Sequence, residues 1–150
     1  MTYTTNVDVL NNFFGLDLHG WYKGDYRSKT NPNRIVWFPK LDYFKYGKKI
    51  TGDPEWSNEF LDNSNEILIT KPINPEKHIA RIKMKDCYWD SSVEFALFAR
   101  IKNINRKWEG KYYGIYCFLD GDRTTGKRRY KRIEKEINKN TANDWLIKGE

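Results

Sequence analysis

The residues best suited to chemistry lie between positions 100 and 135, where cations alternate with aromatic side chains. This segment holds twelve Lys and Arg against four acids, a net charge of +8, whereas the rest of the chain sums to −1. A cluster of one sign interleaved with rings suits a polyanion with stackable bases, so nucleic acid is the expected partner, DNA in preference to RNA. We assign backbone phosphate contacts to Arg106, Lys107, Arg123, Lys127, Arg128, Arg129, Lys131 and Arg132.

Several aromatic residues lie in sequence contexts that suit the wall of a base pocket. One tryptophan sits in GWYKGDY (residues 20–26), between two glycines that imply turns or a close backbone approach. Another lies in RIVWF (34–38), where strand alternation points it away from its two neighbours and Pro39 ends the strand near a rim. The candidates for base stacking are Trp21, Trp37, Tyr113 and Tyr116.

One spacing of acids and lysine would suit a metal-dependent nuclease. Glu109-Gly110-Lys111 provides an acid-x-lysine pair, and Asp90 could supply the upstream carboxylate that holds a divalent cation. Surface charges near a turn explain the same residues more simply. We therefore expect no catalytic residue, metal or cofactor, and keep Asp90, Glu109 and Lys111 as the alternative catalytic set.

GDRTTGKR (121–128) has the spacing of a phosphate-binding loop. Arg128 occupies the position where Ser or Thr would hold magnesium, and too little chain follows for a nucleotide-hydrolysing sheet. The segment is predicted to be the polar turn of a β-hairpin that leads into RRYKRI.

The composition indicates a folded chain. With 150 residues, 39% hydrophobic and 16% aromatic, residues 1–150 are predicted to form a single β-rich domain. Cys87 and Cys117 lie in apolar surroundings without a zinc-binding pattern, so reduced thiols are expected. No targeting sequence or membrane-spanning run is visible, which predicts a cytoplasmic protein without a membrane partner.

The pattern along the chain predicts more strands than helices. Helices are expected over 7–14 with Asn6 as the cap, from Asp53 through Leu61, and near Trp145. Strands are expected over 34–38, 66–71, 78–85, 93–102, 111–119 and in RRYKRI. The fold class is α+β: a small, mainly antiparallel β-sheet or barrel with two or three short helices.

The segments FFG, GWYKGDY, RIVWFPKL, YYGIYCFLDGD and RRYKRI together resemble small domains attached to bacterial restriction and other defence proteins. These belong to the PUA, SRA and EVE group of compact β-barrels, which read modified or flipped bases in aromatic pockets. The resemblance implies a PUA-like, DNA-binding module of a restriction-modification or defence system, with a nuclease or helicase as partner. Two alternatives stay open: a metal-dependent restriction-type nuclease, and a phage-encoded inhibitor that binds a defence nucleoprotein or protein.

Overall fold

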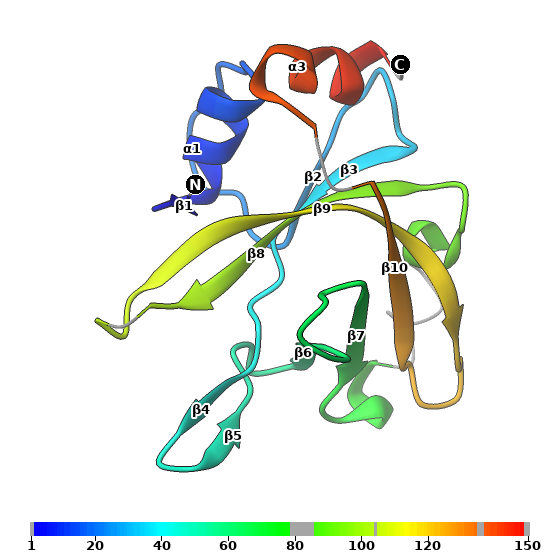
Figure 1. The fold of residues 1–150 in the computed structure, drawn as a ribbon. Coiled ribbons are helices and arrows are strands. Elements are labelled where there is room, and N and C mark those ends of the chain that lie inside the picture. Colours follow the sequence, from blue (N-terminus) through cyan, green and yellow to red (C-terminus); the bar gives the residue numbers. More distant parts are fainter. Residues whose placement is uncertain (1, 79–85, 104, 135–136, 149–150) are drawn as a thin grey trace.

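The computed structural model describes residues 2–78, 86–103, 105–134 and 137–148, and an open, curved sheet dominates it (Figure 1). β3 and β8 pair in parallel, and the other pairings between the described strands are antiparallel. The expected α+β, mainly antiparallel fold is therefore confirmed. The eight strands follow the order β2 (Asp25–Arg27), β3 (Arg34–Trp37), β8 (Glu94–Lys102), β9 (Trp108–Gly121), β10 (Arg128–Glu134), β7 (Ile67–Pro72) and β6 (Trp56–Phe60), with β1 (Thr2–Tyr3) beside β9.

Most strands lie where the sequence pattern places them. The strands expected at 34–38, 66–71, 93–102, 111–119 and in RRYKRI are β3, β7, β8, β9 and β10. The strand expected over 78–85 lies outside the described residues from position 79 onward. Sequence reasoning missed a separate hairpin, which projects from the main sheet in Figure 1 and consists of β4 (Tyr43–Lys45) and β5 (Lys48–Ile50).

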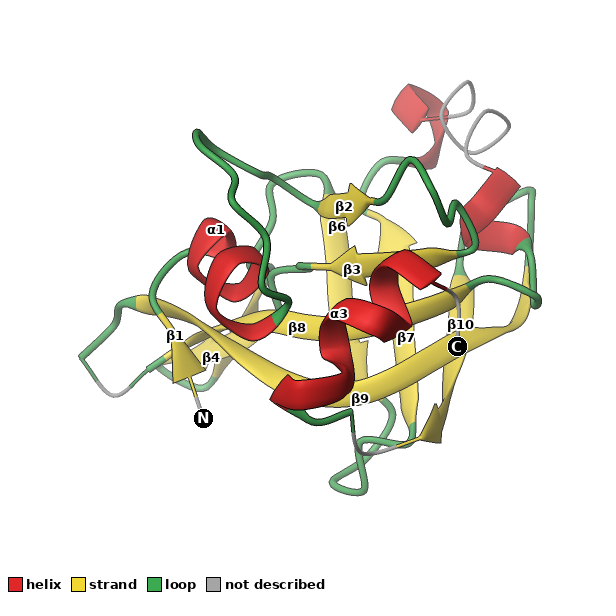
Figure 2. Ribbon diagram, turned by 90° about the horizontal axis from the view of Figure 1, so that it is seen from above, coloured by secondary structure: helices red, strands yellow, loops and turns green. Residues whose placement is uncertain are grey.

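Alternation along β3 builds an apolar core on each face of the sheet. Val36 and Phe38 pack into a cluster with residues of the N- and C-terminal helices, which lie over the same face in Figure 2. Ile35 and Trp37 point the other way, into a cluster with Tyr88 and residues of β7, β8, β9 and β10. Trp37 is thus opposed to both its neighbours, as the strand period of two requires.

The N-terminal helix forms as a helical turn, α1 (Asn6–Asp8), continued by a π-helical turn, η1 (Val9–Phe13). Its cap is Thr5 rather than the expected Asn6, because Thr5 Oγ1 accepts a hydrogen bond from the Asp8 backbone N–H at 3.2 Å. Asn6 Nδ2 instead donates to the Tyr22 carbonyl at 2.6 Å and ties the helix to the loop after Gly20. Gly15, at φ +68°, follows the helix in the left-handed conformation that often ends one.

The helix expected to start at Asp53 is wrong, because the chain there enters strand β6. Asp53 Oδ1 accepts from the backbone N–H groups of Glu55 at 2.8 Å and Trp56 at 3.2 Å, which is the chemistry of a helix cap used in a turn. The residues that follow pair with β7, from Trp56 opposite Pro72 to Phe60 opposite Leu68. The same local signal can begin a helix or a turn, and pairing with β7 determines that the following residues form a strand.

The segment 121–128 is a hairpin turn, as predicted. The Asp122 N–H donates to the Lys127 carbonyl at 2.8 Å, and the Gly126 N–H donates to the Asp122 carbonyl at 2.7 Å. β10 leaves this turn, and α3 (Lys139–Lys148) follows it. This helix begins before Trp145, as predicted, and extends past that residue. Two 3-10 turns, η2 (Pro75–His78) and η3 (Asp86–Trp89), flank the undescribed segment. Cys87 and Cys117 are free thiols, as predicted.

Candidate nucleic-acid interface

A cavity of about 690 Å³ opens beside the second core. It reaches from β2 and β3 to η3 and β10, and its size is typical of small-molecule sites. We call it the aromatic pocket. The lining residues that matter for its chemistry are Asp25, Trp37, Trp56, Tyr88, Trp89 and Arg128.

The inner wall of the aromatic pocket is held rigidly by ring contacts. Trp37 is 6% exposed, and its ring meets those of Tyr88 and Tyr130 edge-on, with centroids 5.4 Å and 5.0 Å away. Tyr88 stacks on Phe95 at 5.1 Å. Because each ring is fixed by two or more others, the wall is formed before any ligand arrives.

A carboxylate lies beside this wall. Asp25 pairs with Trp37 across the β2–β3 ladder, so both side chains point to the same face. The Tyr88 hydroxyl donates a hydrogen bond to Asp25 Oδ2. Burial, with the nearby Asp25 as the next cause, raises the pKa of Tyr88 well above its ordinary value, so this phenol stays a neutral donor. Asp25 keeps acceptor capacity for a further donor, because a carboxylate offers about four lone-pair sites.

Arg128 is a buried cation in the same cavity. The residue is 7% exposed, and its guanidinium carbon lies 5.1 Å from the ring centroid of Trp56, 5.3 Å from that of Tyr88 and 5.7 Å from that of Trp89. Gly121 makes room for this arrangement, because a Cβ there would lie 2.6 Å from Trp89 Cζ3. The sequence assigned Arg128 to a phosphate on the surface, and its burial places the side chain inside the pocket instead.

The rim of the aromatic pocket is aromatic and basic. Trp21 is 91% exposed and lines the cavity from a loop in which Gly20 and Gly24 take φ values of +102° and +80°. Lys23, Lys40 and Arg100 also line the cavity, and no carboxylate among the described residues forms an ion pair with them.

The predicted phosphate contacts do not form one patch. Arg106 and Lys107 are exposed in the β8–β9 turn, whereas Arg123 and Lys127 are exposed in the β9–β10 turn. These turns lie at opposite ends of β9, which has 14 residues and so extends for roughly 45 Å along its path. Lys131 is exposed on β10.

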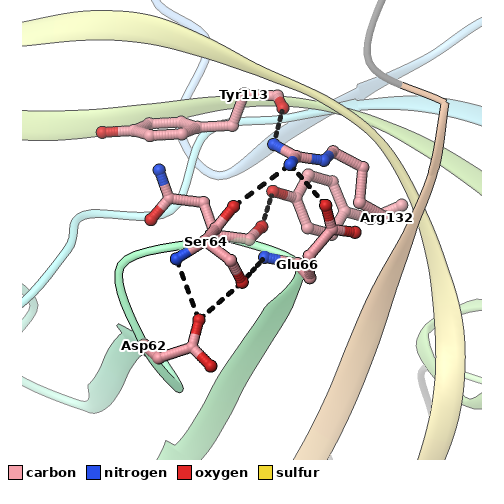
Figure 3. A network of polar contacts seen from close by, with 7 residues as sticks. Asp62, Ser64, Glu66, Tyr113 and Arg132 are labelled. Carbon is pink, nitrogen blue, oxygen red and sulfur yellow. Dashed lines mark hydrogen bonds and ion pairs between the residues drawn. The ribbon is translucent and has the colours of Figure 1, made fainter.

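Two of the predicted phosphate contacts are engaged inside the protein. Arg129 forms a bidentate ion pair with Asp120 across the β9–β10 hairpin. Arg132 donates to Glu66 at 2.7 Å and to the backbone carbonyls of Ser64 and Tyr113 at 3.1 Å and 3.2 Å (Figure 3). The Arg132 side chain is 9% exposed, so this network locks the β6–β7 turn to β10 and leaves little of the cation for DNA.

The two predicted tyrosines lie apart from the aromatic pocket. Tyr116 is fully buried, and its hydroxyl donates to the Asn65 carbonyl at 2.5 Å, so its ring offers no face to a base. Burial also raises the pKa of Tyr116 far above its ordinary value. Tyr113 is half-buried beside Phe60, with ring centroids 4.9 Å apart, and lines a second cavity with Lys111 and Arg132.

The alternative nuclease residues are far apart. Glu109 lies opposite Ile101 at one end of the β8–β9 ladder, whereas Asp90 precedes Glu94 at the other end. Eight residues of β9 separate these ends, from Glu109 to Cys117 opposite Glu94, which is roughly 26 Å. No group of three His, Cys, Asp or Glu residues within the described part of the chain could hold a metal ion.

Sequence reasoning missed three residues of the aromatic pocket and one basic surface. Trp56 was assigned to a helix, while Asp25 and Tyr88 carried no motif; the position of Asp25 after GWYKG was the available signal. The β4–β5 hairpin exposes Phe44 and Tyr46 beside lysines.

Within the described residues, no helix is both long and apolar enough to cross a bilayer.

Comparison with known proteins identifies the family of the chain. No curated protein matches it. One solved structure, "The 5-Hydroxymethylcytosine-Specific Restriction Enzyme AbaSI", superposes with a TM-score of 0.67 at 18% sequence identity, over 91% of this chain and 39% of that one. This similarity shows a shared fold, and the chain corresponds to well under half of AbaSI. The family model of the SET and RING associated domain (SRA) matches residues 1–139, and the chain therefore belongs to the SRA family.

Proposed function

We propose that the aromatic pocket receives a modified cytosine turned out of a DNA duplex. SRA domains bind DNA and read modified cytosine by flipping the base. The observation that carries the proposal is the juxtaposition, in one cavity of about 690 Å³, of the Trp37 and Tyr88 rings with the Asp25 carboxylate. A flipped base needs this combination of flat apolar walls and a polar group that reads its edge.

Asp25 is the group that would recognise cytosine. The exocyclic amino group on C4 of cytosine is a donor, and a carboxylate accepts from it. The Tyr88 hydroxyl fixes the orientation of Asp25 before the base arrives, so little ordering remains to be done on binding.

The rim and the two hairpin turns would hold the DNA backbone. Lys23, Lys40 and Arg100 line the pocket, so they would lie within reach of the phosphates beside a flipped nucleotide. Exposed cations at both ends of β9 extend this surface along the duplex. The phosphate contacts we propose beyond the rim are Arg106, Lys107, Arg123, Lys127 and Lys131.

5-Hydroxymethylcytosine is one modification that we propose the pocket accepts, and the proposed partner activity is a nuclease. AbaSI, which shares the fold, is described as a 5-hydroxymethylcytosine-specific restriction enzyme, and this chain covers 39% of it. The described residues bring no nuclease constellation together, so cleavage would require a nuclease joined to this domain or bound to it. We further propose that residues 1–150 fold as one reading domain.

Trp21 offers the cleanest test of this function, because its side chain is 91% exposed and its removal costs the fold little. Trp21→Ala should weaken binding to a duplex with one 5-hydroxymethylcytosine by about 1–3 kcal/mol, the usual contribution of base stacking. The slope of log affinity against log salt should not change, because no phosphate contact is lost.

The control for Trp21→Ala is Leu61→Ala, which shortens an exposed apolar side chain outside the pocket lining. Titrations of both variants, followed by tryptophan fluorescence and by gel shift, should separate them. Equal affinities for Trp21→Ala and the parent would remove Trp21 from the interface. Equal binding of modified and unmodified duplexes by the parent protein would refute the reading function itself.

A further inference from the structure

Arg128 is a buried cation without a matching anion. Its Nη2 reaches Thr70 Oγ1 at 3.5 Å, which is the long limit of a hydrogen bond, and its Nε is buried without a hydrogen-bond partner. No carboxylate among the described residues forms an ion pair with it. The guanidinium also interacts with the Tyr130 hydroxyl, and its Nε–H remains a buried donor that the protein does not use.

Ring contacts alone do not account for this placement. The guanidinium lies within 6 Å of the ring centroids of Trp56, Tyr88, Trp89 and Tyr130, and such contacts attract a cation. They do not satisfy its N–H groups, which a buried Arg ordinarily directs at oxygen atoms. Since Arg128 lines the aromatic pocket, a ligand bound there is able to supply the missing acceptor.

Arg128 and Asp25 flank the same tyrosine. The Tyr88 hydroxyl bonds to Asp25, and the Tyr88 ring centroid lies 5.3 Å from the Arg128 guanidinium carbon. If Asp25 accepts a hydrogen bond from the C4 amino group of the base, Arg128 would lie near one of the two ring atoms bonded to C4. In cytosine that neighbour is C5 on one side and N3 on the other.

The direction of entry favours C5. The sugar leaves cytosine at N1, and O2 is attached next to N1, so O2 faces the mouth when the base enters with its sugar outward. The C4 amino group and the substituent on C5 point inward. A substituent on C5 also projects beyond the ring, whereas N3 is recessed within it, so a buried donor in the pocket lining, such as Arg128, meets the substituent first.

We propose that Arg128 selects the chemical nature of the C5 substituent, favouring groups that present oxygen acceptors, and a carboxylate above all. This inference rests on the proposed reading of a flipped cytosine and adds its specificity. A hydroxymethyl oxygen would accept one hydrogen bond from the guanidinium. A carboxylate would accept two and neutralise the buried charge, whereas a methyl group would leave the guanidinium without an acceptor.

The first experiment uses the unaltered protein and four duplexes that differ at one cytosine. The duplexes carry cytosine, 5-methylcytosine, 5-hydroxymethylcytosine or 5-carboxylcytosine, and their affinities are measured at one salt concentration and neutral pH. The expected order is carboxyl, then hydroxymethyl, then methyl, with at least tenfold, or about 1.4 kcal/mol, between carboxyl and methyl. Binding of the methyl duplex equal to or tighter than that of the carboxyl duplex would overturn the proposal.

The second experiment removes the cation. Arg128→Met keeps a long side chain without charge, and its affinities for the carboxyl and methyl duplexes should differ by less than threefold. Arg128→Lys should restore part of the preference, because it returns a positive charge without the planar fork. The matched control is Arg123→Met, since Arg123 is exposed in the same hairpin, 4.5 Å from the Trp89 ring, and outside the pocket lining. As a proposed phosphate contact, Arg123 should contribute equally to all four duplexes, so this variant should bind each of them more weakly and keep the preference for carboxyl over methyl.

The outcomes distinguish the two proposals. An equal loss for all four duplexes in Arg128→Met would place Arg128 on N3, O2 or a phosphate and refute the C5 assignment, while the reading function would stand. Equal affinity of the unaltered protein for all four duplexes would refute the reading function. Thermal unfolding of each variant checks that the fold is kept, and the first experiment decides the matter if Arg128→Met does not fold.

Discussion

Replacing Asp25 by asparagine should separate recognition of the base from stability of the fold. Asparagine keeps the size of the side chain and an oxygen that can still accept from the Tyr88 hydroxyl, so the free energy of unfolding should fall by about 0.5–1.5 kcal/mol. A hydrogen bond to a charged group contributes more than a neutral one. Binding of a duplex with one 5-hydroxymethylcytosine should therefore weaken by about 1–2 kcal/mol, or roughly 5- to 30-fold.

The assay for Asp25→Asn is a gel shift or fluorescence titration, with urea unfolding for stability. Asp62→Asn provides the control, because it makes the same change of charge at a carboxylate that accepts from the Ser64 hydroxyl at 2.5 Å in an exposed turn. We expect that control to bind DNA like the parent. If Asp25→Asn reads the modified base as well as the parent does, Asp25 does not recognise the base and the assignment of the polar edge is wrong.

Two further predictions concern the fold that holds the pocket. Gly114→Ala should lower the free energy of unfolding in urea by several kcal/mol. Gly114 has φ +131°, and an added Cβ would lie 2.7 Å from the Glu134 carbonyl oxygen. A variant as stable as the parent would contradict this prediction. Stability should also fall as the pH rises above about 10, because burial raises the pKa values of Tyr88, Tyr116 and Tyr130 above 10.0 and the neutral phenols favour the folded state below that pH. Circular dichroism and tyrosinate absorbance between pH 8 and pH 11.5 would measure it, and a flat profile would count against buried phenols.

The sequence predicts the sheet well where local pattern and tertiary pairing agree. In RIVWF, strand alternation alone places Trp37 opposite Val36 and Phe38, and the two cores confirm it. At Asp53 the local signal misleads, because an aspartate that accepts from the next backbone N–H groups starts a helix or a turn equally well. Pairing with β7 determines that a strand forms here, and β7 lies more than ten residues further along the chain, outside the local pattern.

The pocket was harder to predict because its residues are spread over the chain. Trp21 and Trp37 were named from local context, and both line the cavity. Tyr88 and Trp56 come from segments whose sequence shows no sign of meeting Asp25. Residues 100–135 do hold the excess of cations, but these cations do not form the single basic surface that the count suggested. β9 separates its two turns, Arg132 bonds to Glu66, and Arg128 turns inward.

A crystal structure of the domain bound to a short duplex with a single 5-hydroxymethylcytosine would show whether the aromatic pocket receives a flipped base. We expect the modified base outside the duplex and within the aromatic pocket, with its ring against Trp21 or Trp37, its C4 amino group on Asp25 and its C5 substituent toward Arg128. A modified base that stays stacked in the duplex while the domain is bound, or one seated elsewhere on the surface, would contradict it.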